Sequence, residues 1–521
     1  MPLHVTTSIN AAVVIPPVRD FYFTHHRFSA LGARIVYEIL KKFFPSSKFF
    51  NFPLMRKKPL AAVLPDELSY LNAHIIEDEI GKLSFFKKYK HFGPSITDCA
   101  EKIASAKIDL CLISCFAYCY SRTAVELAEK IKLNNKNCII IIGGAGVSAS
   151  PEYFLKSDFI DYVVSGEAEV SLPEMITCLM NRTIPLHSIP NIGWKEDGKQ
   201  VLSKVKRFTQ SSEIKPLITP TFENKESIFL STTLSRGCSF KCQFCSNRIS
   251  QGSTFRTPDI KKIEQSFLAT SHDILSKEKG IILNFEDDNV LLDYDYLIDI
   301  IYICQSIYKK ISFSFENGID YRLLTPQRCR ELISLGVCQF NFSIATTDQS
   351  ISGTENRFQS ISNLDQLYQI IKESNIPVIT YFICGFPDDT HDTIIRNLHY
   401  LMNRPTQSGI SLFYAVPGLD YYHNETVKKH LFLPSLFAGS SAFPWNNSLS
   451  TTTLITAFRL SRLVNLIKSD DKNDQDKQLI EQIILEKKLF TAVKESSNRS
   501  TISEIPIQDY ILVRSFVEAV F

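Results

Sequence analysis

The sequence predicts an α/β protein: an N-terminal Rossmann-like, doubly wound parallel sheet, then a partial (β/α)6 TIM-like barrel and a helical C-terminal region. In the first half, short continuous apolar runs alternate with amphipathic stretches, which is typical of parallel strands joined by crossover helices. The alternation resumes at Ser227 with six further strand candidates, as in an incomplete barrel. Beyond about residue 430 the alternation stops and the pattern becomes helical.

Length sets the expected domain organisation. A chain of 521 residues holds two to four domains at roughly 150 residues per domain. We expect a Rossmann-like domain over 1–190, a hairpin and linker over 191–225, the barrel over 226–430 and the helical region over 431–521.

Composition narrows the classes of partner. The chain is 44% hydrophobic and 21% charged, as in ordinary globular proteins, and its formal net charge is +2. Such a charge gives no electrostatic case for a nucleic acid or an anionic membrane. No run reaches the roughly 18 apolar residues of a membrane span, and the N-terminus lacks the basic segment of a signal peptide. We expect a cytoplasmic protein whose 13 cysteines are mostly free thiols.

The elements of the first half follow from the spacing of apolar residues. The expected order is a strand at 11–18, a helix at 30–43, a strand at 107–118, a helix at 122–135, a strand at 137–146, and a strand, turn and helix at 160–180. Asp197-Gly198 then stands between two short strand-like pieces, which predicts a hairpin.

The elements of the second half carry clearer start signals. The six strand candidates are 227–234, 280–287, 311–317, 337–345, 376–386 and 409–416. Thr257 and Thr325 each precede a proline, the order expected at a helix N-terminus, and Asp293 is a third candidate cap.

Three cysteines directly follow the first strand of the second half. Cys238, Cys242 and Cys245 have the spacing C-x3-C-x2-C, which lets one loop place three thiolates around one centre. Thiolates select zinc or iron–sulfur clusters, and a structural zinc needs a fourth nearby ligand. The nearest histidine or cysteine after the loop is His272. A cubane cluster held by three cysteines leaves one iron free for another ligand, so the loop favours such a cluster.

This loop resembles the signature of the radical S-adenosylmethionine (SAM) enzymes. The resemblance lies in "CSFKCQFC", with the aromatic Phe244 before the last cysteine. It implies a partial β/α barrel and a 4Fe-4S cluster on Cys238, Cys242 and Cys245, whose free iron binds SAM. It also implies cleavage of SAM to a 5′-deoxyadenosyl radical, with electrons from a donor such as a flavodoxin or ferredoxin.

The ends of later strands match the same family more loosely. The resemblance implies SAM contacts at strand ends, and the candidates are Phe244, Glu286, Asp287, Ser343, Gly385 and Pro387. Asp288, next to Asp287, is a further candidate. The stretch after the fourth strand departs from the family, because Ser343-Ile344-Ala345-Thr346 stands where relatives often carry Gly-x-Glu-Ser.

The first half resembles the cobalamin-binding domain that precedes the barrel in cobalamin-dependent radical SAM enzymes. Its glycine spacing does not fit the dinucleotide fingerprint. The resemblance implies cobalamin contacts at Ser114, Gly143, Gly144, Gly166 and Glu167. No D-x-H-x-x-G run is present, so the expected cobalt has no histidine on its lower face. His25 and His26 follow the first strand, but at the wrong spacing.

Two further groups of cysteines are weighed as sites. Cys111, Cys115 and Cys119 recur every four residues, but strand residues four apart lie roughly 13 Å from each other, so buried thiols are favoured over a second cluster. Cys384 ends the fifth strand, where a covalent role competes with that of a core thiol.

Together these patterns predict a cobalamin-dependent radical SAM enzyme. We expect it to methylate an unactivated carbon of a small molecule, lipid or peptide. A radical cyclisation or rearrangement with the same cofactors is one alternative. The other is a non-enzymatic metal or redox-sensing protein with zinc at the three cysteines.

Overall fold

The computed structural model describes residues 9–24, 27–75, 81–83, 88–181, 183–275, 279–358, 360–419, 424–446, 448–489 and 508–521. The chain forms two compact units. The first comprises Met1–Val63, Tyr89–Asn317 and Val416–Ser435, and the second comprises Leu64–Lys88, Gly318–Ala415 and Leu436–Phe521. Each unit is described by itself.

The N-terminal sheet of the first unit has the strand order β10-β9-β8-β7-β6-β1-β3. Its strands are β1 (Ala11–Ile15), β3 (Lys48–Asn51), β6 (Leu110–Ser114), β7 (Ile139–Gly143), β8 (Tyr162–Val164), β9 (Ile192–Glu196) and β10 (Lys199–Leu202). Strands β3, β1, β6, β7 and β8 are parallel, and the strand order reverses beside β1. Open sheets of this kind bind ligands beyond the carboxyl ends of the strands at that reversal.

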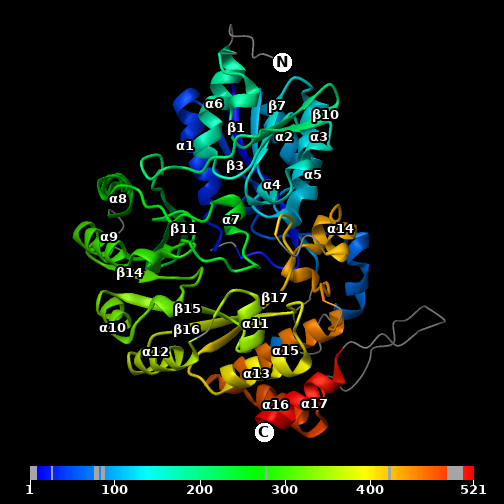
Figure 1. Cartoon of the computed structure of the whole chain (residues 1–521), viewed down its shortest axis with the longest axis vertical. Helices are drawn as coiled ribbons and strands as arrows, with labels where there is room; N and C mark the ends of the chain where they lie inside the picture. Colours follow the sequence, from blue (N-terminus) through cyan, green and yellow to red (C-terminus); the bar gives the residue numbers. More distant parts are fainter. Residues whose placement is uncertain are drawn as a thin grey trace, which may run out of the picture. The chain divides into compact units, whose positions relative to one another are not determined.

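Helices cover both faces of this sheet, which confirms the predicted doubly wound fold (Figure 1). One face packs on α1 (Leu31–Phe43) and α6 (Ala168–Asn181). The other packs on α2 (Ile96–Ser105), α3 (Ser121–Asn134), α4 (Ala145–Ala149) and α5 (Pro151–Leu155). Because successive side chains of a strand point to opposite faces, Val13 joins the first core and Val14 the second.

The predicted hairpin is present and extends the sheet, since β9 pairs antiparallel with β8 and β10. Asp197 and Gly198 both have positive φ, as this tight hairpin turn requires. The stretch expected to be a linker contains a further strand, β11 (Ile218–Glu223), which pairs antiparallel with the first barrel strand. Its Pro220 lies at a register shift, and proline is tolerated at such an edge.

A small sheet that the sequence patterns did not predict has the order β2-β5-β4. Its strands β2 (Val18–Asp20), β4 (Leu60–Ala61) and β5 (Lys90–Phe92) are too short to show a period of two. Strand β3 was missed for the same reason.

All six predicted barrel strands are found. The first unit contains β12 (Ser227–Thr232), β13 (Gly280–Phe285) and β14 (Ile311–Ser314), which run parallel. The second contains β15 (Val337–Ala345), β16 (Val378–Cys384) and β17 (Gln407–Leu412), also parallel. The helices between them are α7 (Asn247–Ser250), α8 (Ile260–Leu275), α9 (Tyr294–Ile307), α10 (Pro326–Ser334), α11 (Gln349–Thr354), α12 (Ile361–Glu373) and α13 (His391–Met402).

Two of the three predicted helix caps form as expected. Asp293 accepts a hydrogen bond from the backbone N of Tyr296 at 3.1 Å, and Thr325 accepts one from that of Arg328 at 3.2 Å. The third was misplaced, because α8 begins at Ile260 and not at the proline after Thr257.

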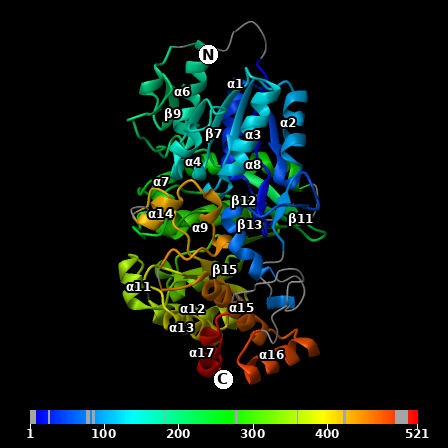
Figure 2. The ribbon, with the colours of Figure 1, turned by 90° about the vertical axis from the view of Figure 1, so that its right-hand side faces the viewer.

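The C-terminal region is helical, as predicted. It contains α14 (Glu425–His430) in the first unit, and α15 (Thr451–Lys468), α16 (Asp474–Glu486) and α17 (Tyr510–Val520) in the second. Helix α15 is tied to β17, since Asn465 Nδ2 donates to the Ser408 carbonyl at 2.8 Å. Figure 2 shows α15 beside α13 and α17. None of the described helices is long and apolar enough to cross a bilayer.

Candidate functional site

The cysteine loop leaves the carboxyl end of β12 and is held by its own backbone. Arg236 and Arg256 form an isolated antiparallel bridge across the base of the loop. Gly237 has φ +76°, and a Cβ there would lie 2.4 Å from the Thr254 carbonyl oxygen, so only glycine fits. The backbone N of Cys245 donates to the Cys242 carbonyl at 3.2 Å, which winds the loop between these two cysteines.

The three thiols of this loop are partly or fully buried. Burial raises the pKa of Cys238, and that of Cys245 to about 11, so both hold their protons at neutral pH until a metal displaces them. Among the described residues, no three cysteine, histidine or acidic side chains gather into a site for a single metal ion. Thiolates are the ligands that iron–sulfur clusters and zinc both select, so these three cysteines could hold such a centre.

The carboxylates after β13 lie beside this loop. Asp287 is buried and accepts the backbone N of Leu234 at 2.9 Å and the Ser235 hydroxyl, so it holds the start of the loop. Burial raises its pKa to about 6. Burial also raises the pKa of Asp288 to about 6, and its Oδ2 is buried with no hydrogen-bond partner among the described residues. Of the two neighbours, Asp288 is thus the better placed to meet an amino group.

Glu286 is tied to the N-terminal domain. Its carboxylate accepts the Ser29 hydroxyl at 2.7 Å, and burial raises its pKa. Nearby, Arg27 Nε lies 3.3 Å from Glu316. The segment after β1 therefore reaches the strand ends of the barrel half within the first unit.

Within the first unit, a cavity of about 580 Å³ lies between the N-terminal sheet with its helix α1 and the strand ends of the barrel half. Its N-terminal wall is built by α1 and by the ends of β1, β6, β7 and β8. Its other wall is contributed by Thr233, Arg236, Ser250, Gln251, Glu286 and Asn317. The structure brings several predicted cofactor residues together here, namely Ser114, Gly143, Gly144, Gly166, Glu167 and Glu286. Asp287 and the half-buried Phe244 are not among the lining residues.

The two glycine turns on the N-terminal wall are linked by one hydroxyl. Ser148 Oγ accepts the backbone N of Gly166 at 2.7 Å and donates to the Gly144 carbonyl at 3.1 Å. Gly144 has φ +113°, and a Cβ would lie 2.4 Å from the Cys115 carbonyl oxygen. At Gly143 the corresponding distance to the Val164 carbonyl oxygen is 3.3 Å. These glycines thus let neighbouring strand ends approach, which leaves the cavity edge open.

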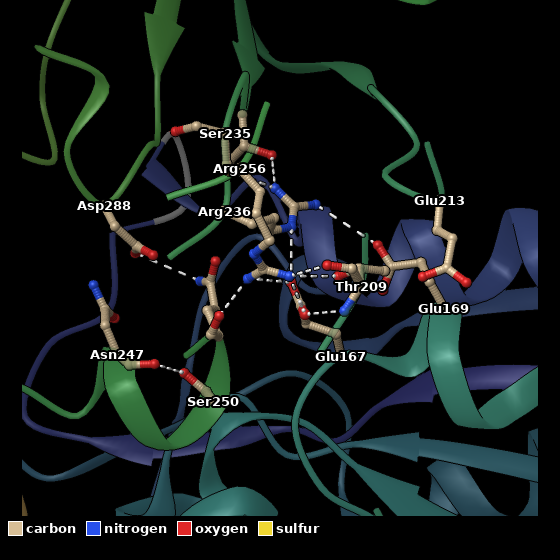
Figure 3. A network of polar contacts seen from close by, with 12 residues as sticks. Glu167, Glu169, Thr209, Glu213, Ser235, Arg236, Asn247, Ser250, Arg256 and Asp288 are labelled. Atoms are coloured by element: carbon tan, nitrogen blue, oxygen red, sulfur yellow. Dashed lines mark hydrogen bonds and ion pairs between the residues drawn. The ribbon is translucent and has the colours of Figure 1, made fainter. Parts of the chain in front are cut away.

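Glu167 lines the cavity, but its carboxylate is engaged by protein groups (Figure 3). Arg256 Nη1 lies 2.9 Å from it, the backbone N of Thr209 donates to it at 2.8 Å, and Arg236 Nε is 3.9 Å away. Glu169 lies 3.9 Å from Arg236. Sequence reasoning missed both arginines; the signal available was the position of Arg236 directly before Gly237-Cys238.

The remaining predicted site residues belong to the second unit. Ser343 lies at a bulge near the end of β15, followed by Ala345 with φ +60°, and its carbonyl accepts Arg357 Nη2 at 2.9 Å. Gly385 has φ +103°, and its N donates to Asp389 at 2.7 Å. Pro387 is half-buried in the same turn.

Of the other cysteines considered as sites, Cys384, Cys111 and Cys115 are core thiols, and Cys119 is half-buried. Cys384, Cys111 and Cys115 are all 2% exposed or less, and burial raises the pKa of each. All are free thiols. His25 and His26 lie outside the described residues.

Comparison with known proteins agrees with this geometry. Residues 232–401 match the radical SAM superfamily, and residues 87–176 match the B12 binding domain. An uncharacterized methyltransferase of Pyrococcus horikoshii is 24% identical over 53% of this chain and 60% of its own length. The bacteriochlorophyllide d C-12(1)-methyltransferase of Chlorobaculum tepidum is 24% identical over 44% of this chain and 52% of its own length. The chain thus spans little more than half of these relatives.

A solved structure shares the fold. The radical SAM methyltransferase TsrM from Kitasatospora setae, determined with cobalamin and a 4Fe-4S cluster bound, superposes with a TM-score of 0.56 at 11% identity, covering 79% of this chain and 74% of TsrM. The chain therefore carries a B12-binding domain ahead of a radical SAM domain, the two domains that the cobalamin-dependent radical SAM proteins combine.

Proposed function

We propose that this protein is a cobalamin-dependent radical SAM enzyme that methylates an unactivated carbon of a small molecule, lipid or peptide. The observation that carries the proposal is the cavity of about 580 Å³, bounded on one side by the glycine turns of the B12-binding domain and on the other by residues that flank the cysteine loop, Thr233, Arg236, Ser250 and Gln251. A single cavity lined from both sides suits chemistry that needs both cofactors at once.

Cys238, Cys242 and Cys245 would hold a 4Fe-4S cluster, with Phe244 between the last two ligands. When bound, the cluster and SAM supply a 5′-deoxyadenosyl radical, and cobalamin supplies the methyl group. Asp288 offers SAM a buried carboxylate oxygen without a partner. Asp287 positions the start of the loop instead, because its carboxylate accepts hydrogen bonds from the backbone N of Leu234 and from the Ser235 hydroxyl.

On the other wall, Ser114, Gly143, Gly144 and Gly166 would meet cobalamin. The apolar residues Val13, Ile15, Leu112, Ile141 and Val164 line the same space. They exclude water from a site where a carbon radical must not be quenched.

Ser343, Gly385 and Pro387, which belong to the second unit, remain proposed as SAM contacts on the family resemblance alone. Cys384 is better explained as a core thiol, because a thiol that holds its proton is a weak nucleophile. We further propose a cytoplasmic protein reduced by a flavodoxin or ferredoxin, and the division of the chain near residues 190, 225 and 430.

The test is an oxygen-free preparation reconstituted with iron, sulfide and hydroxocobalamin. We expect about four irons per chain, the visible bands of both cofactors, and reductive cleavage of SAM to 5′-deoxyadenosine. Cys242→Ala should lose iron and cleavage, whereas Cys338→Ala, which changes a cysteine of β15 and not of the loop motif, should keep both. A single zinc and no cleavage would refute the proposal and favour the non-enzymatic alternative.

A second arm separates methylation from rearrangement. Candidate substrates are added with SAM and reductant, and nucleoside products are counted by mass spectrometry. Methylation produces S-adenosylhomocysteine along with 5′-deoxyadenosine and a product heavier by one methylene. A turned-over substrate with 5′-deoxyadenosine alone would favour cyclisation or rearrangement.

A further inference from the structure

The buried ion-pair network beside the cavity joins the B12-binding domain to the cysteine loop (Figure 3). We propose that Glu167 is a positioning residue that fixes the cysteine loop against the B12-binding domain through Arg256. This inference rests on the proposed function, since it assigns how the two cofactor sites are held at a constant spacing.

The first step is the burial of the pair. The Glu167 side chain is 4% exposed and that of Arg256 is 8% exposed. Arg256 Nη1 reaches Glu167 Oε2 at 2.9 Å and Arg256 Nη2 reaches Oε1 at 3.4 Å, a two-pronged contact. Two hydrogen bonds between a guanidinium and a carboxylate fix the relative orientation of the two groups as well as their distance. A lysine ammonium would not fix this orientation.

The second step runs from Arg256 into the loop. Its backbone exchanges two hydrogen bonds with Arg236, at 2.9 and 3.0 Å, and Arg236 directly precedes Gly237-Cys238. The Arg256 guanidinium also donates to the Gln251 carbonyl. The Gln251 side-chain amide lies 3.5 Å from Asp288, next to the cysteines. A displacement of Arg256 would therefore shift the backbone on both sides of the cysteine loop, at Arg236 and at Gln251.

The third step runs from Glu167 to the cobalamin edge of the sheet. Gly166 donates its N–H to Ser148 Oγ, and this hydroxyl binds the carbonyl of Gly144. The Glu167 carbonyl accepts the N–H of Val170 at 3.3 Å, in the first turn of α6. The carboxylate thus projects from a turn that is fixed to the glycine edge of β7.

The charges explain why Glu167 carries the contact. The buried guanidiniums of Arg236 and Arg256 are both close to its carboxylate, and Glu169 reaches only Arg236. Loss of the Glu167 charge leaves Arg256 without an ionic partner among the described residues. A buried unpaired charge is unfavourable, so Arg256 would move and take the loop with it. Shifts of about 1 Å at a reacting centre are enough to impair catalysis.

The competing role is direct contact with cobalamin, because Glu167 lines the cavity whereas Arg256 does not. The two roles predict different patterns. A cofactor contact makes Glu167→Gln weaken hydroxocobalamin binding more than Arg256→Met does. A positioning pair makes both variants behave alike, and the double variant is then no worse than either single one.

The experiment compares hydrogen–deuterium exchange of residues 232–256 in the reconstituted holoprotein for wild type, Glu167→Gln, Arg256→Met and the double variant. Glu213→Gln is the matched control, since Glu213 pairs with Arg207 in the same connecting segment and does not contact the loop. We expect each single variant to accelerate loop exchange at least about tenfold. The double variant should match the singles, and the control should match wild type. Arg256→Lys serves as a milder probe if Arg256→Met does not fold.

The second readout is the number of 5′-deoxyadenosine molecules formed per S-adenosylhomocysteine, which a mere loss of folded protein would not change. We expect this ratio to rise in both single variants. Unchanged loop exchange in Glu167→Gln, additive effects in the double variant, or an equal response in Glu213→Gln would each overturn the inference. A wild type that cleaves no SAM would instead refute the proposed function. The exchange pattern would still decide whether Glu167 holds the loop.

Discussion

Gly144 provides the sharpest test of how the cavity edge is built. Its backbone has φ 113° and ψ 177°, a region that is accessible almost only to glycine. A Cβ at this position would also lie 2.4 Å from the Cys115 carbonyl oxygen. That carbonyl is not free to move, because it accepts the backbone N of Gly146 at 3.0 Å. Gly144→Ala must therefore strain the backbone and separate the ends of β6 and β7.

The two effects set the magnitude. The backbone conformation costs about 1–3 kcal/mol for alanine, and forcing one extra methyl group into a packed contact costs about 1–3 kcal/mol more. The matched control is Gly198→Ala in the hairpin turn, where φ is +74° and nothing lies within 4 Å of the new Cβ. It carries only the left-handed penalty of about 1–2 kcal/mol.

The assay is native-state hydrogen exchange of the amides that join β6 to β7, such as that of Cys115, which donates to the Gly143 carbonyl at 2.8 Å. A loss of about 2 kcal/mol or more corresponds to at least about 30-fold faster exchange. Gly198→Ala should leave these amides near their wild-type rates. Equal rates in the two variants would show that the close approach of Gly144 to Cys115 does not hold this edge.

Further outcomes follow from three buried groups. Asp287→Ala, which leaves the Leu234 N–H without its acceptor, should lower the free energy of unfolding by about 1–3 kcal/mol, whereas Asp287→Asn keeps one acceptor oxygen and should lose less. Burial raises the pKa of Asp287 from 3.8 to about 6, so its protonation contributes stability that is fully present below pH 3.8 and is lost as pH rises through about 6. In Asp287→Asn, the free energy of unfolding should therefore depend less on pH in this range. Burial raises the pKa of Glu355 to about 8, so Glu355→Gln should gain thermal stability over wild type between about pH 6 and pH 9; an equal difference at both ends would contradict this. Cys384, whose pKa burial raises far above its usual range, should resist iodoacetamide in the folded protein, as peptide mass spectrometry can verify.

Sequence patterns predicted the strands that are buried on both faces. A short, continuous apolar run can adopt few structures other than such a strand. All six barrel strands and the central strands of the N-terminal sheet were found in this way. Patterns failed where a strand is short or lies at an edge. In β11, with Pro220 at a register shift, pairing with β12 decides the conformation although the local sequence reads as a linker.

The candidate site shows a different limit of sequence reasoning. Local motifs marked several of the strand ends that line the cavity, but they do not reveal whether a carboxylate faces the cavity or binds groups of the protein. Glu167 and Asp287 both stand in motifs at strand ends, yet their partners lie far away along the chain: Arg256 is 89 residues from Glu167, and Leu234 is 53 from Asp287. An acidic residue beside a cofactor site must either face the ligand or satisfy buried donors of the protein, and a single sequence carries no record of such distant pairs. The two carboxylates that resemble cofactor ligands are, in the folded chain, the groups that fasten the cysteine loop from its two sides.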